Sequence, residues 1–395
     1  MEFAERLSRL GTENAFVVLA EVNKLKAAGH DIVSFSIGEP DFDTPDNIKQ
    51  ACIKALADNQ THYGPSAGLP ALRETIAAYI GRTRGMSVAA DEVVVTPGGK
   101  PIIYFLIHAL VDPGDEVLYP NPGFPIYESV IRFVGGVPVP IPLLEEKEFS
   151  LDTKELKKLI TPRTKLMILN SPQNPTGGIL TNSDLEDIAK LAVEHDLWVL
   201  SDEIYSRILY EGEFRSIAAL PGMKERTIIL DGFSKTYAMT GWRLGYGVMP
   251  ADLATQMARL ETNCESCTNT FVQIAGIEAL TGPQDSVDAM VAEFTARRKL
   301  IVDGLNSIPG ITCKNPGGAF YVFPNVTEAC RMMGLADSKA LQHHLLYNAG
   351  VAALPRTSFG VKNIGETQEY LRFSYATSQE VIAEGIRRIK ACLKG

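Results

Sequence analysis

Short apolar runs alternate with longer helix-like segments through the middle of the chain. The run at 92–96 precedes an apolar helix-like segment at 100–110, and the run at 164–170 precedes an amphipathic segment at 182–196. Further short apolar runs lie at 116–120, 197–202, 227–232 and 244–249. Apolar strands separated by helices predict an α/β fold, in which a mostly parallel sheet is covered by helices on both faces.

The two ends of the chain show a different pattern. Residues 12–28 predict an amphipathic helix that ends at Gly29, and residues 285–306 predict a long helix with one apolar face. Thr377 and Glu380 have the spacing of a capping box, which predicts the start of a last helix. After the apolar segment 318–324 (GAFYVFP), a helix is expected at 338–349 and a strand at 370–376.

This change of pattern predicts two domains. A chain of 395 residues is long for a single hydrophobic core. We expect a large α/β domain over 45–285. A smaller α+β domain would be built from both chain ends, 1–44 together with 286–395.

Composition and charge narrow the class of partner. The formal net charge is −9 and the sequence pI is about 5.3, which argues against nucleic acid because duplex binding needs a clustered basic surface. We find no run of about 18 apolar residues that predicts a membrane span. The N-terminal segment is charged and lacks the apolar core of a secretory signal, so we expect a cytoplasmic protein.

The six cysteines are scattered, and only Cys264 and Cys267 form a CxxC pair. A structural zinc site needs a second pair of ligands at suitable spacing, and none is nearby. We therefore expect free thiols and no metal site.

Candidate chemistry gathers where predicted strands end. In open parallel sheets, ligands bind outside the carboxyl ends of the strands. The glycines of the segment 97–100 (PGGK) open a helix, where backbone N–H groups can approach a phosphate. The loop 171–178 (SPQNPTGG) carries Asn174. These segments are also compatible with a tight turn and a plain loop.

Two further strand ends carry ionisable side chains. Asp202 and Tyr205 follow one predicted strand, and Lys235 and Arg243 follow the next. A carboxylate at a strand end can simply cap a helix. A lysine there is costly to desolvate unless it is paired or its amine is needed neutral.

Pyridoxal phosphate would use each of these groups. Its aldehyde needs the amine of a lysine, here Lys235, for a Schiff base. Its pyridine nitrogen needs a carboxylate, its phenolic oxygen a tyrosine, and its phosphate a helix N-terminus with an arginine. Burial and a nearby guanidinium would both lower the lysine pKa and free the amine for attack.

At this point the sequence resembles the class I/II aminotransferases of the aspartate aminotransferase fold, over essentially the whole chain. Seven motifs carry the resemblance, at 38–45 (GEPDFDTP), 63–74 (YGPSAGLPALRE), 98–100 (GGK), 171–177 (SPQNPTG), 201–205 (SDEIY), 234–245 (SKTYAMTGWRLG) and 371–378 (LRFSYATS). The resemblance implies a sheet of about seven strands and a ping-pong transfer of an amino group from an L-amino acid to a 2-oxo acid. It implies donors of the aspartate, alanine or aromatic type and 2-oxoglutarate as acceptor.

The family pattern implies roles for the cofactor-binding residues. Lys235 matches the Schiff-base lysine, which also moves the α-proton. Asp202 matches the partner of the pyridine nitrogen, and Tyr205 that of the phenolic oxygen. Asn174 matches the residue that contacts both the phenolic oxygen and the substrate carboxylate. The phosphate shell is matched by Gly99, Lys100, Ser234 and Arg243.

Substrate-binding residues follow from the same pattern. Arg372 matches the arginine that binds the substrate α-carboxylate, and Gly38 donates its backbone N–H to that group. Phe124 stands where many relatives have a tryptophan or tyrosine stacked on the cofactor, beside the substrate. Tyr63 matches a tyrosine that reaches the phosphate of the neighbouring subunit, so the resemblance implies a homodimer with shared active sites.

The segment 261–270 departs from the pattern of aspartate-specific relatives. Those relatives carry an arginine there for the distal carboxylate of the substrate, whereas this chain has Glu265. If Glu265 faces the pocket, neutral donors should rival aspartate. Lys100 or a mobile Arg356 could replace the missing arginine. His108 could also do so, although its apolar helix favours a core position.

Two other functions remain open. A carbon–sulfur β-lyase would share the cofactor-binding residues but eliminate a thiol from the β-carbon. The loop 171–177 looks more like the aminotransferase version. A non-enzymatic pyridoxal-phosphate-binding regulator usually carries an added DNA-binding segment, which this sequence does not show, and would not need both Lys235 and Arg372.

Overall fold

The computed structural model describes residues 2–393, and its central element is a mixed, mostly parallel sheet of eight strands. Their order is β2-β9-β8-β7-β6-β3-β4-β5, and β9 and β5 run antiparallel to their neighbours. The bounds are β2 Val93–Thr96, β3 Glu116–Asn121, β4 Val137–Leu144, β5 Ser150–Leu151, β6 Thr164–Asn170, β7 Trp198–Asp202, β8 Thr227–Gly232 and β9 Gly245–Val248. The predicted fold class is confirmed, and the two-residue β5 is added to a sheet of seven longer strands.

All six strands predicted for the middle of the chain are present, but β4 escaped the sequence analysis. Its sequence, VPVPIPLL, places prolines at alternate positions. Proline has no N–H to donate, which argues against a strand. In β4 the prolines at 138, 140 and 142 alternate with residues whose N–H groups face β3, so the parallel ladder from Glu116 to Asn121 remains possible.

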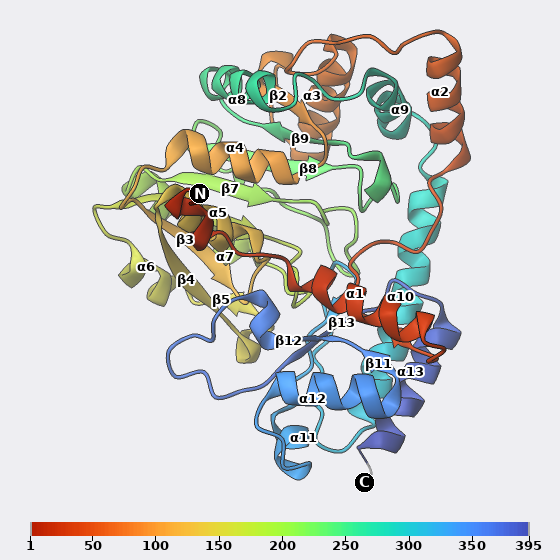
Figure 1. Ribbon diagram of the computed structural model, residues 1–395. Helices are drawn as coiled ribbons and strands as arrows, with labels where there is room; N and C mark the ends of the chain where they lie inside the picture. The colour runs from red at the N-terminus through yellow and green to blue at the C-terminus, as the bar shows by residue number, and fades with distance from the viewer. Residues whose placement is uncertain (1, 394–395) are drawn as a thin grey trace.

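Helices cover both faces of the sheet (Figure 1). One face is packed by α4 (Lys100–Leu110), α5 (Ile126–Val134) and α8 (Ala251–Cys264). The other is packed by α3 (Pro70–Arg84), α6 (Thr153–Leu159), α7 (Asn182–Glu194) and α9 (Thr270–Thr281), with α2 (Asp46–Ala57) against α9. Residues of one strand alternate between the two cores, as the period of a strand requires: Val117 faces α4 and Leu118 faces α7.

In the lower half of Figure 1 the red α1 lies near the blue C-terminal elements, whereas residues 5–11 lie against α5. A parallel pair joins β1 (Val33–Ser34) to β11 (Val351–Ala352). An antiparallel sheet has the order β10-β13-β12. Its strands are β10 Tyr321–Val322, β13 Leu371–Ser374 and β12 Leu354–Pro355. The division of the chain into domains at residues 45 and 285 remains a prediction.

The helices of this half are α1 (Asn14–Ala27), α10 (Asp285–Asn306), α11 (Thr327–Met332), α12 (Ser338–His344) and α13 (Gln379–Cys392). Ser378, and not Thr377, caps α13, because its hydroxyl accepts the N–H of Val381 at 3.3 Å. The helix predicted over 338–349 changes after His344 into one π turn. Within residues 2–393 no helix has the length and apolar composition that crossing a bilayer requires.

A buried ion cluster fixes the ends of two central strands. Arg84, the last residue of α3, contacts Glu203 just after β7 (2.7 Å) and Asp231 within β8 (2.9 Å). All three side chains are almost fully buried, and burial raises the pKa of Asp231 to about 7 despite the opposing charge of Arg84. A buried charge left without its partner costs several kcal/mol, roughly 3–5. Arg84 therefore fixes the ends of β7 and β8, which carry Asp202 as the last residue of β7 and Lys235 shortly after β8.

Candidate active site

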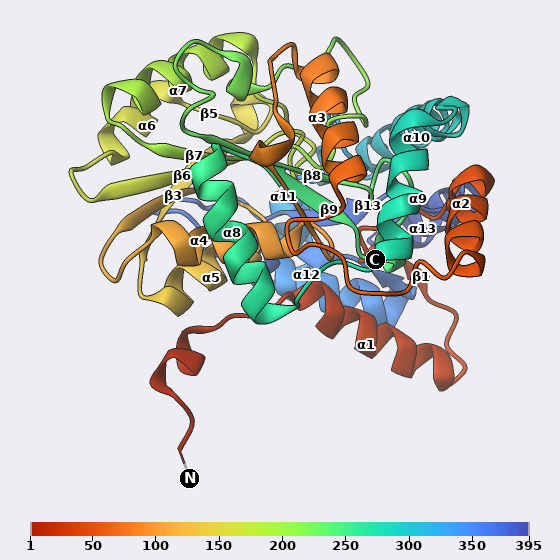
Figure 2. The same ribbon diagram turned by 90° about the horizontal axis from the view of Figure 1, so that it is seen from above.

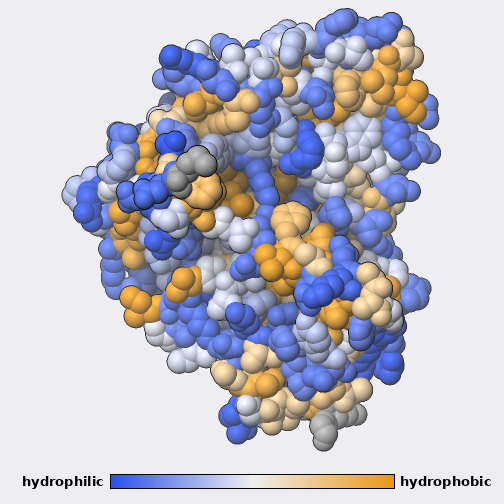
Figure 3. Space-filling model, in the orientation of Figure 1, coloured by the Kyte–Doolittle hydropathy of each residue, from blue (hydrophilic) through white to orange (hydrophobic). Residues whose placement is uncertain are grey.

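A cavity of about 540 Å³ opens at the carboxyl ends of β6, β7 and β8. One wall comes from these strand ends and the N-terminus of α4, and the opposite wall from α1, residues 37–39, β10 and β13. The space-filling view shows the surface hollowed between the two halves of the molecule (Figure 3). Of the residues proposed from the sequence, all except Tyr63 line this cavity: Gly38, Gly99, Lys100, Phe124, Asn174, Asp202, Tyr205, Ser234, Lys235, Arg243 and Arg372.

Lys235 follows β8, and its amine lies against the opposite wall of the cavity. Nζ donates to the backbone oxygen of Gly38 at 2.5 Å, and no ion pair is found for this lysine among the described residues. Burial lowers the pKa of Lys235 to about 8. The charge of Arg372 lowers this pKa further, whereas the carboxylate of Glu39 opposes the change. A larger fraction of the amine is therefore neutral near pH 7 than in an exposed lysine.

Asp202 ends β7 and is buried at the floor of the cavity. Burial raises its pKa to about 6, while a hydrogen bond from the hydroxyl of Tyr127, at 2.6 Å, lowers it. The carboxylate is thus ionised at neutral pH and suited to hold a cationic ligand atom. Tyr127 lies on α5 and was not predicted as a site residue, since its distance of 75 positions from Asp202 gives no local signal.

Tyr205 is paired with a second unpredicted tyrosine. Its hydroxyl lies 2.8 Å from that of Tyr321 in β10, and both side chains are buried. Tyr321 also explains a glycine: a Cβ at Gly38 would lie 2.2 Å from the Tyr321 hydroxyl. A larger residue at position 38 would clash with Tyr321, and without a side chain the backbone of Gly38 can itself border the cavity.

Arg372 is buried in β13, with its neighbours Leu371 and Phe373 on the core side as the alternation predicted. Its guanidinium donates to Asn174 Oδ1 at 3.1 Å and to the backbone oxygen of Ser36 at 2.5 Å. Its Nε is buried without a hydrogen-bond partner. Arg372 also lines the cavity, and a buried guanidinium whose donors are not all satisfied by the protein is suited to a carboxylate.

The N-terminus of α4 supplies a place for an anion. Gly99 precedes the helix, and Gly98 has a φ of 91°, which an L side chain rarely adopts. A Cβ at Gly98 would lie 2.3 Å from Arg243 Nη2, so the guanidinium packs directly on this glycine. Arg243 donates to Thr240 O at 2.8 Å, and Ser234 lines the same end of the cavity. Helix N–H groups, a hydroxyl and a guanidinium fit a phosphate.

Lys100 lines the cavity but is occupied by an acid. Its Nζ lies 2.5 Å from Glu13 Oε2, at the start of α1. The amine also lies 5.5 Å from the centre of the Phe124 ring and 5.6 Å from that of Phe16. The Phe124 ring itself contacts Tyr127 edge-to-face, at 5.7 Å between ring centres. Glu13 and Phe16 were not predicted as site residues.

Tyr63 lies outside the cavity. Its side chain is 91% exposed, in a segment held by a hydrogen bond from Thr270 Oγ1 to the backbone oxygen of His62. Within this chain Tyr63 therefore reaches none of the other predicted residues.

The structure changes the interpretation of two residues considered for the distal carboxylate. Glu265 ends α8 as an exposed residue and does not line the cavity of its own chain. The expectation of a core position for His108 is wrong, because this histidine is exposed and stacks on Tyr104 at 4.2 Å. It does not line the cavity either.

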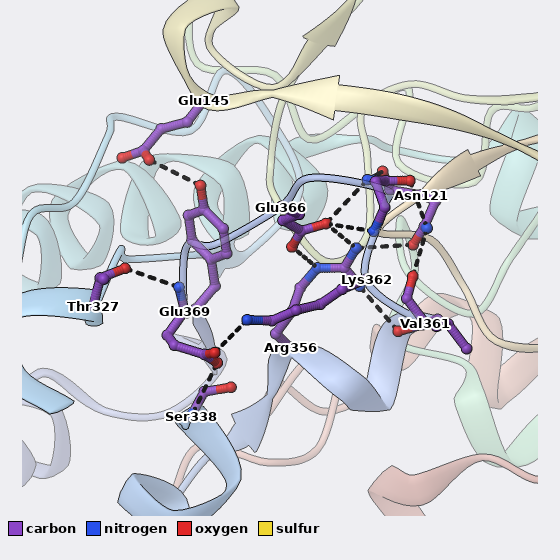
Figure 4. A network of polar contacts seen from close by, with 12 residues as sticks. Asn121, Glu145, Thr327, Ser338, Arg356, Val361, Lys362, Glu366 and Glu369 are labelled. Atoms are coloured by element: carbon purple, nitrogen blue, oxygen red, sulfur yellow. Dashed lines mark hydrogen bonds and ion pairs between the residues drawn. The ribbon is translucent and has the colours of Figure 1, made fainter. Parts of the chain in front are cut away.

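Arg356 is fully buried and is not the mobile arginine that we expected (Figure 4). Its guanidinium forms two contacts with Glu366, at 2.6 and 2.8 Å, and donates to Asn121 Oδ1 at 3.1 Å. The same network includes the ion pair of Lys362 with Glu369. Arg356 therefore ties the segment before β13 to the end of β3.

Comparisons with known proteins agree with this geometry. The family described as aminotransferase class I and II matches residues 30–389. A probable aspartate/prephenate aminotransferase of Aquifex aeolicus is 41% identical over 99% of this chain and 98% of its own. The structure of an aspartate aminotransferase from Rhizobium meliloti superposes with a TM-score of 0.94 at 34% identity, over 100% of this chain and 99% of the other. An aromatic aminotransferase from Pyrococcus horikoshii superposes with a TM-score of 0.88 at 41% identity, over 94% and 98%.

We expect Tyr127→Phe to raise the pKa of Asp202 above its native value of about 6. The lost hydrogen bond stabilises the ionised carboxylate, and bonds to charged groups are worth about 1.5–3 kcal/mol, so the pKa should rise by about one to two pH units. NMR titration of labelled aspartate carboxyl groups in the ligand-free protein measures it. Tyr104→Phe, a phenol outside the cavity, is the control. An unchanged Asp202 titration in Tyr127→Phe would contradict the assignment.

Proposed function

Since the chain belongs to the class I and II aminotransferases and has the aspartate aminotransferase fold, we propose that it moves the amino group of an L-amino acid to a 2-oxo acid. The donors are aspartate and amino acids with aromatic side chains, and the acceptor is 2-oxoglutarate. The names of the relatives support both classes of donor, because they include aspartate, prephenate and aromatic aminotransferases.

Class I and II aminotransferases use pyridoxal phosphate. The cofactor supplies an aldehyde that takes up the amino group and a ring that withdraws electrons from the α-carbon. The cavity fits this group on the evidence of its own residues. Asp202 is a buried, ionised acid for the ring nitrogen, and the glycine turn with Arg243 and Ser234 suits the phosphate. Tyr205 and Asn174 line the same cavity and would serve the phenolic oxygen.

One observation carries the proposal: a lysine of lowered pKa and an arginine with a free Nε share one cavity with a buried acid. Lys235 Nζ would hold the cofactor aldehyde, and its amine, when neutral, could act as the base for the α-proton. Arg372 and Asn174 would bind and orient the α-carboxylate. The Gly38 backbone N–H adds a donor to the same carboxylate.

Specificity for the side chain of the substrate depends on Lys100. It is the cation of the lining that remains once Lys235 is assigned to the aldehyde, Arg243 to the phosphate and Arg372 to the α-carboxylate. Within one chain Glu265 gives no argument against dicarboxylates, since it lies outside the cavity lining. Phe16, Leu19 and Phe124 give the same region apolar surface. We therefore propose a broad enzyme that accepts both dicarboxylic and aromatic donors.

We also propose a homodimer in which Tyr63 completes the phosphate site of the partner. Tyr63 is 91% exposed, and the neighbouring helix α2 exposes two large apolar side chains, Ile53 at 57% and Leu56 at 44%. An exposed apolar surface of this kind fits an interface. The cytoplasmic location stays a prediction from the sequence.

Lys235→Ala should abolish transamination, with a loss of at least about a thousandfold, because the variant lacks both the amine and the proton carrier. The native protein loaded with pyridoxal phosphate should convert aspartate to oxaloacetate in stoichiometric amount without any acceptor, and then stop. Lys165→Ala, which changes an exposed lysine of β6, is the control and should behave as the native protein.

Turnover of Lys235→Ala within tenfold of the native rate would refute the role of Lys235. The same assay separates the alternative function. Continuous release of pyruvate and a thiol from a cysteine conjugate, with no oxaloacetate from aspartate, would identify a carbon–sulfur β-lyase.

The shared site is tested by subunit exchange. Lys235→Ala and Tyr63→Ala proteins should each have little activity alone. After mixing under conditions that allow exchange, each heterodimer would carry one site with both changes and one intact site, so activity should return. Failure to recover activity, with heterodimers shown by mass spectrometry, would contradict the role of Tyr63 in the partner site.

A further inference from the structure

The ion pair between Glu13 and Lys100 belongs to the lining of the cavity. Lys100 is the first residue of α4, where the positive end of the helix dipole disfavours a cation. Its side chain remains 44% exposed and borders the cavity. The only acid in contact with it among the described residues is Glu13, at 2.5 Å.

The side chain of Glu13 does not cap its helix, although Glu13 stands at the N-cap position of α1. A side chain at this position commonly accepts a backbone N–H of the first turn. Here the carboxylate makes no capping hydrogen bond and reaches across to Lys100. α1 thus begins with an acid that faces the cavity and not its own helix.

The surroundings of the pair are apolar and aromatic. Phe16 lies one turn further along α1, and its ring and that of Phe124 lie 5.6 and 5.5 Å from the Lys100 amine. Leu19 lines the same wall. The carboxylate of Glu13 balances the charge of Lys100 between these aromatic rings. This part of the cavity lining therefore carries no net charge while the pair is formed.

The charges of the cavity leave one cation for a substrate side chain. Among the described lining residues the cations are Lys100, Lys235, Arg243 and Arg372. In the proposed function Lys235 binds the aldehyde, Arg243 the phosphate and Arg372 the α-carboxylate. A second acid of the lining, the exposed Glu39, already accepts a hydrogen bond from Thr240 at 2.8 Å.

We propose that Glu13 is an internal substitute for the side-chain carboxylate of the substrate. Paired with Lys100, it forms a neutral wall that accepts aromatic and other uncharged donors. A dicarboxylic donor or 2-oxoglutarate binds by displacing Glu13 from Lys100. This inference rests on the proposed function and names the residue that sets the balance between its two classes of donor.

The test is Glu13→Gln, which keeps the shape of the side chain and removes its charge. The ratio of kcat/KM for aspartate to that for phenylalanine should rise about two- to fivefold, because aspartate no longer competes with a carboxylate for a partly exposed lysine. The dissociation constant of succinate, a dicarboxylate that cannot react, should fall by a similar factor. That of 3-phenylpropanoate should not fall.

Two controls isolate the pair. Glu21→Gln removes an acid of α1 that bonds to Tyr347 outside the cavity, and it should leave the ratio unchanged. In a Lys100→Met background, Glu13→Gln should no longer favour aspartate, since the cation that both carboxylates need is absent.

The outcomes separate the two proposals. A native protein that releases no oxo acid from either donor would overturn the proposed function. A native protein that transaminates both donors, with a ratio and a succinate affinity unmoved by Glu13→Gln, would overturn only the role of Glu13. A Glu13→Gln effect that persists in the Lys100→Met background would also overturn it.

Discussion

Desolvation of two oppositely charged groups at the carboxyl edge of the sheet is the constraint on which the site depends. Lys235 and Asp202 follow adjacent parallel strands, yet neither forms an ion pair with the other among the contacts found. Burial moves the pKa of Lys235 down to about 8 and that of Asp202 up to about 6. The lysine is thereby available as a base or nucleophile near neutral pH, and the acid remains charged for a cationic ligand atom.

The fold maintains this arrangement by bringing distant segments together. The buried cluster of Arg84, Glu203 and Asp231 fixes the ends of β7 and β8 from behind. The chain ends supply the opposite wall, where the backbone oxygen of Gly38 accepts a hydrogen bond from Lys235 and the Nε of Arg372 has no hydrogen-bond partner. The cavity then holds a glycine turn with Arg243, the pair of Lys235 and Asp202, and the ion pair of Glu13 with Lys100. The proposed function rests on this combination more than on any single residue.

Much of this could be predicted from the sequence, because parallel strands bring their carboxyl ends to one edge. The buried runs before Asp202 and Lys235 were recognisable, and their side chains had to lie on the same rim. The alternation around Arg372 also predicted its direction correctly. These inferences needed only local periodicity and the rule for parallel sheets.

What could not be predicted depends on contacts between distant segments. Tyr127 and Tyr321 touch Asp202 and Tyr205 across 75 and 116 positions, and Glu13 meets Lys100 across 87. Local pattern was also misleading in places. The apolar helix around His108 suggested burial, whereas that position faces solvent.

The most direct test of this account is the pKa of the Lys235 amine in the cofactor-free protein. Competitive labelling of lysines over a pH series, read by mass spectrometry with Lys165 as the exposed reference in the same sample, gives this value. The account predicts titration of Lys235 near pH 8. Titration near the ordinary lysine value of 10.5 would contradict it, because burial at the strand ends would then leave the amine as charged as one on the surface.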